Sequence, residues 1–289
     1  MALRGNQQRL LLIDGHAAAY RFFHGIRAMT TSSGTPVQAV FGFVRMMQQF
    51  QRHYYPTHQA VAFDGGVPQS RLDLVPEYKA QRKPMPDELR VQLPILQEYL
   101  AAAGIPCFCL EAIEADDVIA TFARAFPNRV VIGTSDKDMY QLVSERVSIV
   151  PLSGEIVALD AEGVRRKTGV APDQIADWLA LTGDAADNIK GVPGVGPKTA
   201  AKLLDQFGSL AALFDRLEEI PRDRLRNALQ DNQAIVWRNR DMVLLHTVDG
   251  LPLVDTLQTQ SASIESLRRF FEKYEFRAFA QALSAPELF

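Results

Sequence analysis

Glu114-Ala115-Asp116-Asp117 is an acidic stretch between the apolar run of residues 105–110 and an apolar-periodic run over residues 118–126. This order predicts a buried strand, a tight connection and a helix. The helix dipole favours one or two acidic residues in a first turn, but three in four residues exceed what capping requires. Glu114 and Asp117, three residues apart, share one face of that helix. Such a cluster repels itself unless cations bind it, so the stretch indicates a metal site.

Short apolar runs alternate with helical patterns through the first half of the chain. This alternation predicts an α/β fold with a mostly parallel sheet flanked by helices. After a further strand and a probable edge strand, the composition turns helical from residue 160 onward. The predicted strands cover residues 9–13, 60–63, 105–109, 129–133, 147–150 and 155–159, and the first helices cover residues 17–23, 36–50 and 87–103.

Each of the first four predicted strands delivers carboxylates at its carboxyl end. In a parallel sheet these ends lie along one edge, which is where open α/β sheets bind their ligands. A single Asp after a strand is usually a turn residue, but its occurrence after all four strands makes coincidence the poorer account. We therefore expect seven side chains to converge: Asp14, Asp64, Glu114, Asp116, Asp117, Asp136 and Asp138.

Composition narrows the class of protein. No apolar stretch approaches the length of a membrane span, and residues 1–9 are too polar to lead a signal peptide, so a cytoplasmic location is expected. Cys107 and Cys109 alternate on a predicted strand without further ligands nearby, which favours buried structural residues over zinc ligands. The net charge of −3 argues against a simple basic DNA-wrapping protein. Outside the predicted metal site, however, Lys and Arg outnumber the acids, which suits a polyanionic substrate.

Residues 68–86 differ from the rest of the first half. They carry four basic residues, two acidic residues and four prolines. This composition predicts an excursion from the core with one short helix, on which Lys79, Arg82 and Lys83 share a face. A solvated surface loop is the simpler interpretation on composition alone.

A glycine-rich turn lies within the helical half, at Gly191-Val192-Pro193-Gly194-Val195-Gly196. Its backbone amides are uncovered by side chains, and Pro197 suits the first position of the next helix. Amides at a helix N-terminus bind phosphate, and Lys198 adds a positive charge beside them. An ordinary connection between two helices is the alternative, but the pattern favours binding of a DNA backbone.

Five motifs, in order and with matching spacing, resemble the 5′-nuclease domain of bacterial DNA polymerase I and its flap-endonuclease relatives. The similarity runs from about residue 9 to about residue 285. The motifs are Asp14-Gly15-His16, Tyr78-Lys79-Ala80-Gln81-Arg82, Glu114-Ala115-Asp116-Asp117, Thr134-Ser135-Asp136-Lys137-Asp138 and residues 183–200.

The resemblance implies a PIN-like nuclease core over residues 1–168, with a helical arch at about residues 68–86. It implies a helical DNA-binding part over residues 169–289, with a helix-three-turn-helix element at about residues 183–204. Family members hold two divalent ions, normally Mg²⁺ with Mn²⁺ as an alternative, and K⁺ at the glycine-rich turn. Matching motif by motif assigns the metal ligands to Asp14, Asp64, Glu114, Asp116, Asp117, Asp136, Asp138, Asp184 and Asp187.

Asp184 and Asp187 enter this set through the resemblance alone. The resemblance also implies that Lys79 and Arg82 contact the scissile phosphate, and Asp14 and Asp117 are counted with them as catalytic. Lys190 stands where relatives usually have proline and Ser135 where they have glycine, and neither departure removes a ligand. The implied DNA-binding residues are Arg71, Lys79, Arg82, Lys190, Gly191, Gly194, Gly196, Lys198 and Thr199.

These features lead us to expect a metal-dependent, structure-specific 5′ nuclease (5′-3′ exonuclease and flap endonuclease) of DNA replication and repair, active near the nucleoid. Its two ions would lie about 4 Å apart. The implied partners are branched or nicked DNA with a 5′ end or flap and a DNA polymerase in the same or another chain, and a monomer is expected. One alternative is a DNA-binding module with an inactive nuclease site. Another is a small-substrate phosphohydrolase with Asp14 as nucleophile, although His16 stands where such enzymes typically have a second Asp.

Overall fold

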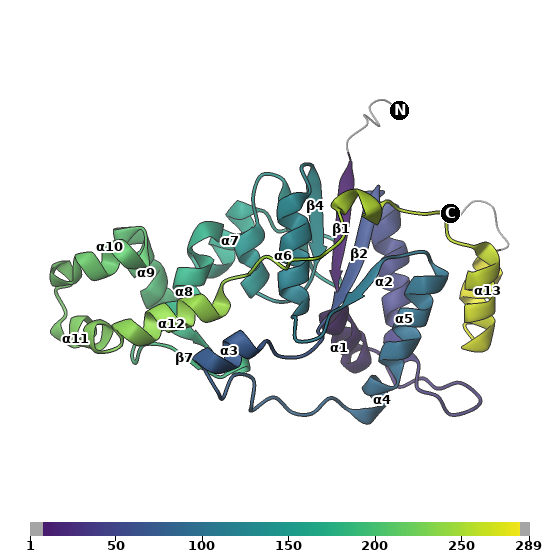
Figure 1. Ribbon diagram of the computed structural model, residues 1–289, viewed down its shortest axis with the longest axis horizontal. Helices are drawn as coiled ribbons and strands as arrows, with labels where there is room; N and C mark the ends of the chain where they lie inside the picture. The colour runs from purple at the N-terminus through teal and green to yellow at the C-terminus, as the bar shows by residue number, and fades with distance from the viewer. Residues whose placement is uncertain (1–7, 284–289) are drawn as a thin grey trace.

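Five parallel strands form the central sheet of the computed structural model, which describes residues 8–283 (Figure 1). The strand order is β3-β2-β1-β4-β5, and Leu12 of the central strand pairs with Ala60 on one side and Ile132 on the other. The predicted α/β fold with a parallel sheet is thus confirmed, and all strand carboxyl ends lie along one edge. The strands are β1 (Arg9–Asp14), β2 (His58–Phe63), β3 (Cys107–Cys109), β4 (Arg129–Gly133) and β5 (Val147–Val150).

Helices cover both faces of the sheet, and alternate residues of β1 pack into opposite layers. Leu10 and Leu12 belong to the apolar cluster under α6, whereas Leu11 and Ile13 belong to the cluster under α1, α2 and α5. Each such buried side chain contributes about 1.5–3 kcal/mol to folding. The helices of this half are α1 (Gly15–Gly25), α2 (Gln38–Tyr54), α3 (Gln69–Leu74), α4 (Asp87–Arg90), α5 (Gln92–Ala102) and α6 (Ala115–Ala125).

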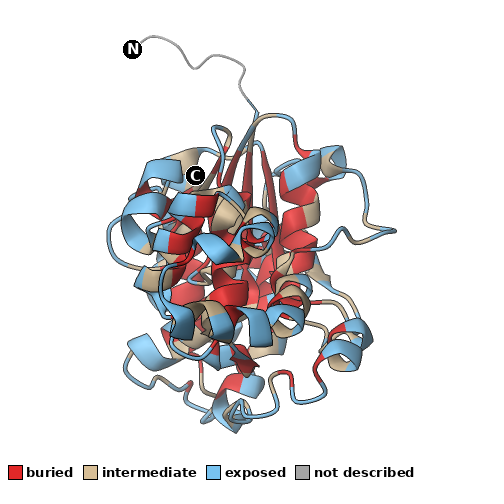
Figure 2. Cartoon of the chain, turned by 90° about the vertical axis from the view of Figure 1, so that its left-hand side faces the viewer, coloured by how far each residue is buried: buried red, intermediate tan, exposed pale blue. Residues whose placement is uncertain are grey.

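The second half is helical apart from one two-stranded hairpin. Most of its apolar residues continue the cluster under α6, so buried residues extend from the sheet into these helices (Figure 2), whereas Leu267, Phe270 and Phe271 near the end of the chain join the cluster under α1, α2 and α5. The hairpin pairs β6 (Gly183–Asp184) with β7 (Ile189–Lys190). The helices are α7 (Ala161–Thr168), α8 (Ile175–Thr182), α9 (Pro197–Phe207), α10 (Leu210–Asp215), α11 (Asp223–Asp231), α12 (Gln233–Val243), α13 (Ile264–Lys273) and α14 (Arg277–Ala282), with 3-10 turns at Asp138–Leu142, Pro172–Gln174, Ala185–Asp187, Leu217–Glu219 and Val254–Leu257.

Two sequence predictions about the sheet are wrong. Residues 155–159 form no strand, because only the single bridge between Ile149 and Leu159 connects them to β5. Cys107 and Cys109 are exposed rather than buried, since β3 is a three-residue strand at the edge of the sheet. Apolar character alone does not separate an edge strand from a central one.

The short helix of the 68–86 segment is displaced from its predicted position. Helix α3 covers Gln69–Leu74, and the chain then turns repeatedly before α4. Lys79 has a φ of +57°, which interrupts any helix that would place Lys79, Arg82 and Lys83 on one face. No helix within residues 8–283 has the length and hydrophobicity of a bilayer crossing. Residues 1–7, predicted from the sequence to be too polar to lead a signal peptide, and residues 284–289 of the predicted helical part lie outside the described residues.

Candidate active site

Four carboxylates lie along the edge formed by the carboxyl ends of the parallel strands: Asp14, Asp64 and Asp136 at or just after β1, β2 and β4, and Asp116 in the first turn of α6. We call them the strand-end group. Asp14 ends β1 and caps α1, accepting from the Ala17 amide at 2.9 Å through Oδ1 and from Thr134 Oγ1 at 3.0 Å through Oδ2. Asp64 Oδ1 accepts from the Ala115 amide at 2.8 Å, which joins the end of β2 to the start of α6. The predicted convergence thus follows from strand order and from these backbone contacts.

The strand-end group is electrostatically crowded. Burial and the nearby Asp64 and Asp136 raise the pKa of Asp14 to about 7, although the hydrogen bond from Ala17 acts in the opposite direction. Burial and the charges of Asp136 and Asp14 raise the pKa of Asp116 well above its ordinary value. Carboxylates that raise one another's pKa are stabilised by a cation placed among them.

A second group joins this edge from the helical half. One carboxylate oxygen each of Asp138, Asp184 and Asp187 lies within 4.8 Å of the others, and we call these three residues the hairpin group. Asp138 Oδ1 is buried without a hydrogen-bond partner, and burial with Asp136 raises the Asp138 pKa well above its ordinary value. Carboxylate oxygens in this arrangement fit a hard divalent cation. Asp136 also lies within electrostatic reach of Asp187 and Asp184, so it links the two groups.

Glu114 and Asp117 are held differently, by the buried guanidinium of Arg71. Arg71 Nη1 contacts Glu114 Oε2, and Nη2 lies 3.2 Å from Asp117 Oδ2. Asp117 Oδ1 also accepts from the His246 amide at 2.7 Å. The two carboxylates share one face of the α6 N-terminus, as predicted. Arg71, which the resemblance assigned to DNA, is only 5% exposed and faces these carboxylates.

The segment with Tyr78, Lys79 and Arg82 lies against the carboxylates. Lys79 Nζ contacts Glu114 and lies 3.9 Å from Asp187, while Arg82 Nη2 contacts Asp187. Tyr78 donates its hydroxyl to Asp187 at 3.1 Å. The Lys79 amide donates to the Asp187 carbonyl at 3.1 Å, so the backbone is fixed as well. The Lys79 side chain is 14% exposed, which is unlike a residue on a solvated loop.

The site residues that were not predicted from the sequence include His16, Thr134 and Tyr78. His16 Nδ1 accepts from the Asp64 amide at 2.9 Å, which leaves the ring proton on Nε2. Burial lowers the pKa of His16, and this effect exceeds that of the nearby Asp64. These residues all belong to the quoted motifs. Their place within those motifs was therefore the one sequence feature that could have identified them as site residues. Their hydrogen bonds depend on side-chain direction, which the motifs do not specify.

The glycine-rich turn connects β7 to α9, and Pro197 is the first residue of α9 as predicted. Gly194 has a φ of +83°, and a Cβ added at Gly194 or Gly196 would meet nothing within 4 Å. These two glycines therefore present open backbone beside the exposed Lys198. Gly191 has another reason to be glycine, because an added Cβ would lie 2.2 Å from the Thr182 carbonyl carbon. Lys190 is exposed and Thr199 is half-buried.

Comparison with proteins of known structure shows the same fold. The T5 D15 protein co-crystallised with metal ions superposes with a TM-score of 0.70 at 23% identity, covering 94% of this chain and all of that one. The catalytic core of Rad2 in complex with DNA substrate gives a TM-score of 0.66 at 18% identity, covering 98% and 93%.

Sequence comparison gives closer relatives. DNA polymerase I of Pseudomonas aeruginosa is 40% identical over 284 residues, and that of Mycobacterium tuberculosis is 40% identical over 285 residues. The matches cover 94% and 95% of this chain but 31% of each polymerase, so the chain spans about a third of these relatives.

Two family models divide the chain between them. The 5′-3′ exonuclease N-terminal resolvase-like domain matches residues 9–169, and the 5′-3′ exonuclease C-terminal SAM fold matches residues 170–265. The first contains the strand-end group, and the second contains Asp184, Asp187 and the glycine-rich turn. Because the two matches are contiguous and cover most of the sequence, the chain belongs to the 5′-3′ exonuclease family.

Proposed function

We propose that this chain is a metal-dependent 5′ nuclease that hydrolyses DNA phosphodiester bonds where single strands meet duplex. The observation that carries the proposal is the meeting of two carboxylate groups at one sheet edge, with Lys79 and Arg82 placed against them. Acidic residues bind metal ions, and cationic side chains bind phosphate, so this edge has both parts of a phosphodiester site. Family membership and the DNA-bound Rad2 core support the same class of substrate.

The two carboxylate groups correspond to two cation positions. The strand-end group would hold one ion and the hairpin group the other, with Asp136 between them. Two Mg²⁺ or Mn²⁺ ions would supply an activated water and stabilise the charge on the leaving 3′ oxygen. Asp138 would use the Oδ1 atom that is buried without a partner.

Glu114 and Asp117 act through Arg71 in this proposal. Both carboxylates are engaged by its guanidinium, so they position the N-terminus of α6 and the segment that carries Lys79. Lys79 and Arg82 would exchange their carboxylate partners for the scissile phosphate and stabilise the charge that develops on it. Arg82 is free to do so because nearly half of its side chain (46%) is exposed.

The glycine-rich turn would bind the duplex away from the cut. The open backbone at Gly194 and Gly196, the first turn of α9, Lys190, Lys198 and Thr199 would contact phosphates. Carbonyls of the same turn would bind K⁺. In the relatives, the matching region makes up 31% of DNA polymerase I. We therefore infer that a DNA polymerase, in the same or another chain, acts on the same DNA. We place this activity in the cytoplasm, in a monomeric nuclease.

The proposal is tested with a labelled 5′-flap duplex, incubated with Mg²⁺ and with a chelator. Cleavage should require the cation, and Asp136→Ala should abolish it while the exposed Asp231→Ala does not. The rival function, a DNA-binding module with an inactive site, predicts binding of the duplex without cleavage under either condition. The complete set of carboxylates counts against this rival. Cation-independent cleavage, or none at all, would overturn the proposal.

A further inference from the structure

The glycine-rich turn is held at both ends by side chains of the helical half. The carbonyl of Lys190, the residue before the turn, accepts from Asn239 Nδ2 at 2.7 Å. The carbonyl of Pro197, the residue after the turn, accepts from Trp178 Nε1 at 3.1 Å. Asn239 belongs to α12 and Trp178 to α8. The turn therefore lies between two fixed points, one on each helix.

Asn239 also contacts the end of α8. Its Nδ2 donates a second hydrogen bond to the Ala180 carbonyl at 3.2 Å. Ala180 lies in the last turn of α8, where carbonyls have no partner within the helix. The neighbouring Leu181 carbonyl accepts from the amide of Val192, a residue of the glycine-rich turn, at 2.9 Å. One side-chain amide thus joins α12, the end of α8 and the end of β7.

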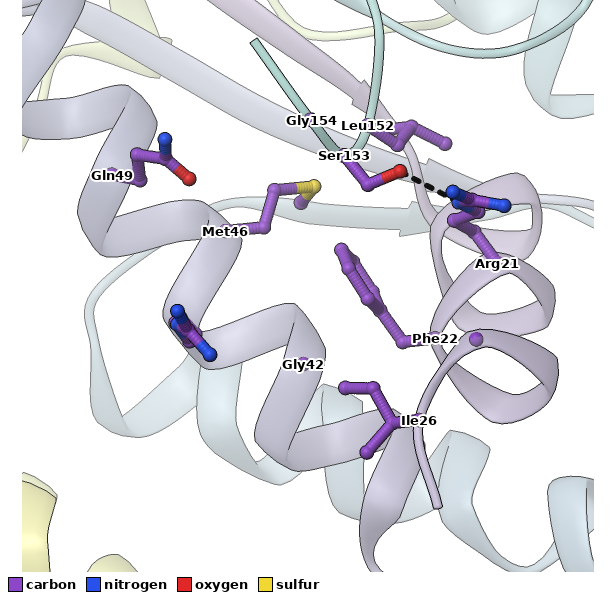
Figure 3. A pocket seen from close by; sticks show the side chains of 11 residues that line it. Arg21, Phe22, Ile26, Gly42, Met46, Gln49, Leu152, Ser153 and Gly154 are labelled. Atoms are coloured by element: carbon purple, nitrogen blue, oxygen red, sulfur yellow. Dashed lines mark hydrogen bonds between the residues drawn. The ribbon is translucent and has the colours of Figure 1, made fainter. Parts of the chain in front are cut away.

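Burial makes the two hydrogen bonds of Asn239 difficult to replace. The bond from Arg21 Nε to Ser153 Oγ, which connects α1 to the loop after β5 beside the cavity of Figure 3, is exposed, so water can substitute for either partner. Asn239 is 0% exposed, and its bond to Ala180 is buried. Loss of the amide would leave carbonyls that water reaches poorly. Both partners are acceptors, so the nitrogen of the Asn239 amide must face them.

Lys190 is also the point where the glycine-rich turn meets the hairpin group. It pairs with Gly183 across the hairpin, beside Asp184 of the hairpin group. A Cβ added at Gly183 would lie 2.3 Å from the Gly191 amide nitrogen, so the two backbones are in close contact there. Holding the Lys190 carbonyl therefore fixes the turn and the hairpin group relative to each other.

We propose that Asn239 is a positioning residue that sets the register between the glycine-rich turn and the hairpin group. A duplex bound at the turn presents its scissile phosphate to the carboxylates only if this register is fixed, because misplacement of reacting groups by about 1 Å is costly in rate. The inference rests on the proposed nuclease function and deepens it. It assigns the precision of the cut to a wholly buried side chain.

Mapping of cut positions with the full chain tests this role. Asn239→Leu keeps the approximate size of the side chain and removes both donors, whereas Asn239→Ser keeps one donor. The matched control is Val236→Ala, also on α12 and also 0% exposed, which removes packing but no side-chain hydrogen bond. Asn239→Leu and Val236→Ala should both lower Tm by about 4–8 °C.

Cleavage of a 5′-flap duplex in Mg²⁺, measured well below Tm, should separate these variants. Asn239→Leu should lower the ratio of the main product to its one-nucleotide neighbours by about threefold to tenfold. Asn239→Ser should lower it less, and Val236→Ala should leave it unchanged. A general loss of stability would not produce this order.

Hydrogen exchange in chelator gives a readout that needs neither cleavage nor a bound cation. The amides of Val192 and Val195 are hydrogen-bonded to the carbonyls of Leu181 and Val192, so their exchange reports opening of the turn. Asn239→Leu should accelerate this exchange about tenfold relative to Val236→Ala. If Asn239→Leu does not fold, Asn239→Ser is compared with Val236→Ala in the same way.

Equal exchange and equal product ratios in the two variants would make Asn239 an ordinary packing residue and overturn the proposal. Faster exchange with an unchanged product ratio would also overturn it, because Asn239 would then hold the turn without setting the cut. A wild-type chain that cleaves no flap would contradict the nuclease function instead, and exchange would still decide whether Asn239 holds the turn.

Discussion

Two sets of carboxylates lie at the same edge of the sheet and are held in opposite ways. Neutral groups fix members of the strand-end group, as the Ala17 amide and Thr134 hydroxyl do for Asp14. A buried guanidinium, that of Arg71, holds Glu114 and Asp117. A neutral donor orients a carboxylate and leaves its negative charge in place. A guanidinium orients the carboxylate and also compensates its charge. We propose that this difference separates the strand-end carboxylates, which attract a cation, from Glu114 and Asp117, which stabilise the fold.

The largest expected effect is that of Asp136→Ala, because Asp136 lies between the strand-end group and the hairpin group. Since a bound divalent ion contributes several kcal/mol of transition-state stabilisation, single-turnover cleavage should fall at least about 10³-fold. Binding of DNA in Ca²⁺ should persist. Removing one of several mutually repelling charges should leave the unfolding free energy in chelator unchanged or higher. A variant that cleaves at the wild-type rate would remove Asp136 from the metal site.

Asp117→Ala should show the opposite pattern, with the largest change in stability. The substitution leaves the buried Arg71 with less compensation, and breaking a buried ion pair costs about 3–5 kcal/mol. Urea unfolding in chelator measures this loss. Replacing all three charges together, with Arg71→Met, Glu114→Gln and Asp117→Asn, should recover part of it, since the buried guanidinium is gone and Lys79, which loses Glu114, still lies 3.9 Å from Asp187. If Asp117→Ala instead keeps full stability and abolishes cleavage, the comparison fails and Asp117 belongs with the strand-end group.

Sequence reasoning reached the strand-end group because parallel strands bring their carboxyl ends together whatever the details of packing. It could not reach Asp184 and Asp187, which come from a hairpin in the helical half and joined the site only through a family resemblance. The burial of Arg71 was also out of reach, because a basic residue among prolines and charges has the composition of a solvated loop. Its partners lie more than forty residues away in the sequence, and only tertiary packing brings them together.

Lys79 and Arg82 are a third case, cations that contact carboxylates from the edge of the site. If they move to the scissile phosphate, Lys79→Ala and Arg82→Ala should each lower kcat by about 10²–10³, or roughly 3–4 kcal/mol. The double variant should lose less than the product of the two single losses if the residues act as a unit. Lys83→Ala is the matched control, since Lys83 is exposed and adjacent in sequence. Single-turnover rates within about threefold of wild type for both would show that Lys79 and Arg82 do not act on the scissile phosphate.

Stability in chelator should fall as pH rises from about 5 to 7. The folded-state pKa of Asp14 is raised to about 7 from 3.8, so the folded chain binds more protons than the unfolded chain between these values. Stability is therefore lost on deprotonation, by at most about 1.4 kcal/mol per pH unit for one proton. Thermal unfolding across this range measures the slope. Asp14→Asn should flatten the slope, and Mg²⁺ should reduce it by stabilising the ionised form. A slope that Asp14→Asn leaves unchanged would assign it to other groups.

The smallest expected effect concerns His16. It tests the carboxylates that are held by neutral groups. The His16 Nδ1 atom accepts a hydrogen bond from the Asp64 amide at 2.9 Å. His16 therefore positions Asp64 through the backbone and adds no positive charge. Losing such a hydrogen bond costs about 0.5–1.5 kcal/mol, or roughly threefold to tenfold in the apparent Mg²⁺ affinity of cleavage. Asn places an acceptor near the Nδ1 position, whereas Gln places one near Nε2. His16→Asn should therefore retain Mg²⁺ affinity better than His16→Gln and His16→Ala. The reverse order would show that His16 acts through Nε2, and equal losses in all three variants would reduce its role to packing against Phe63.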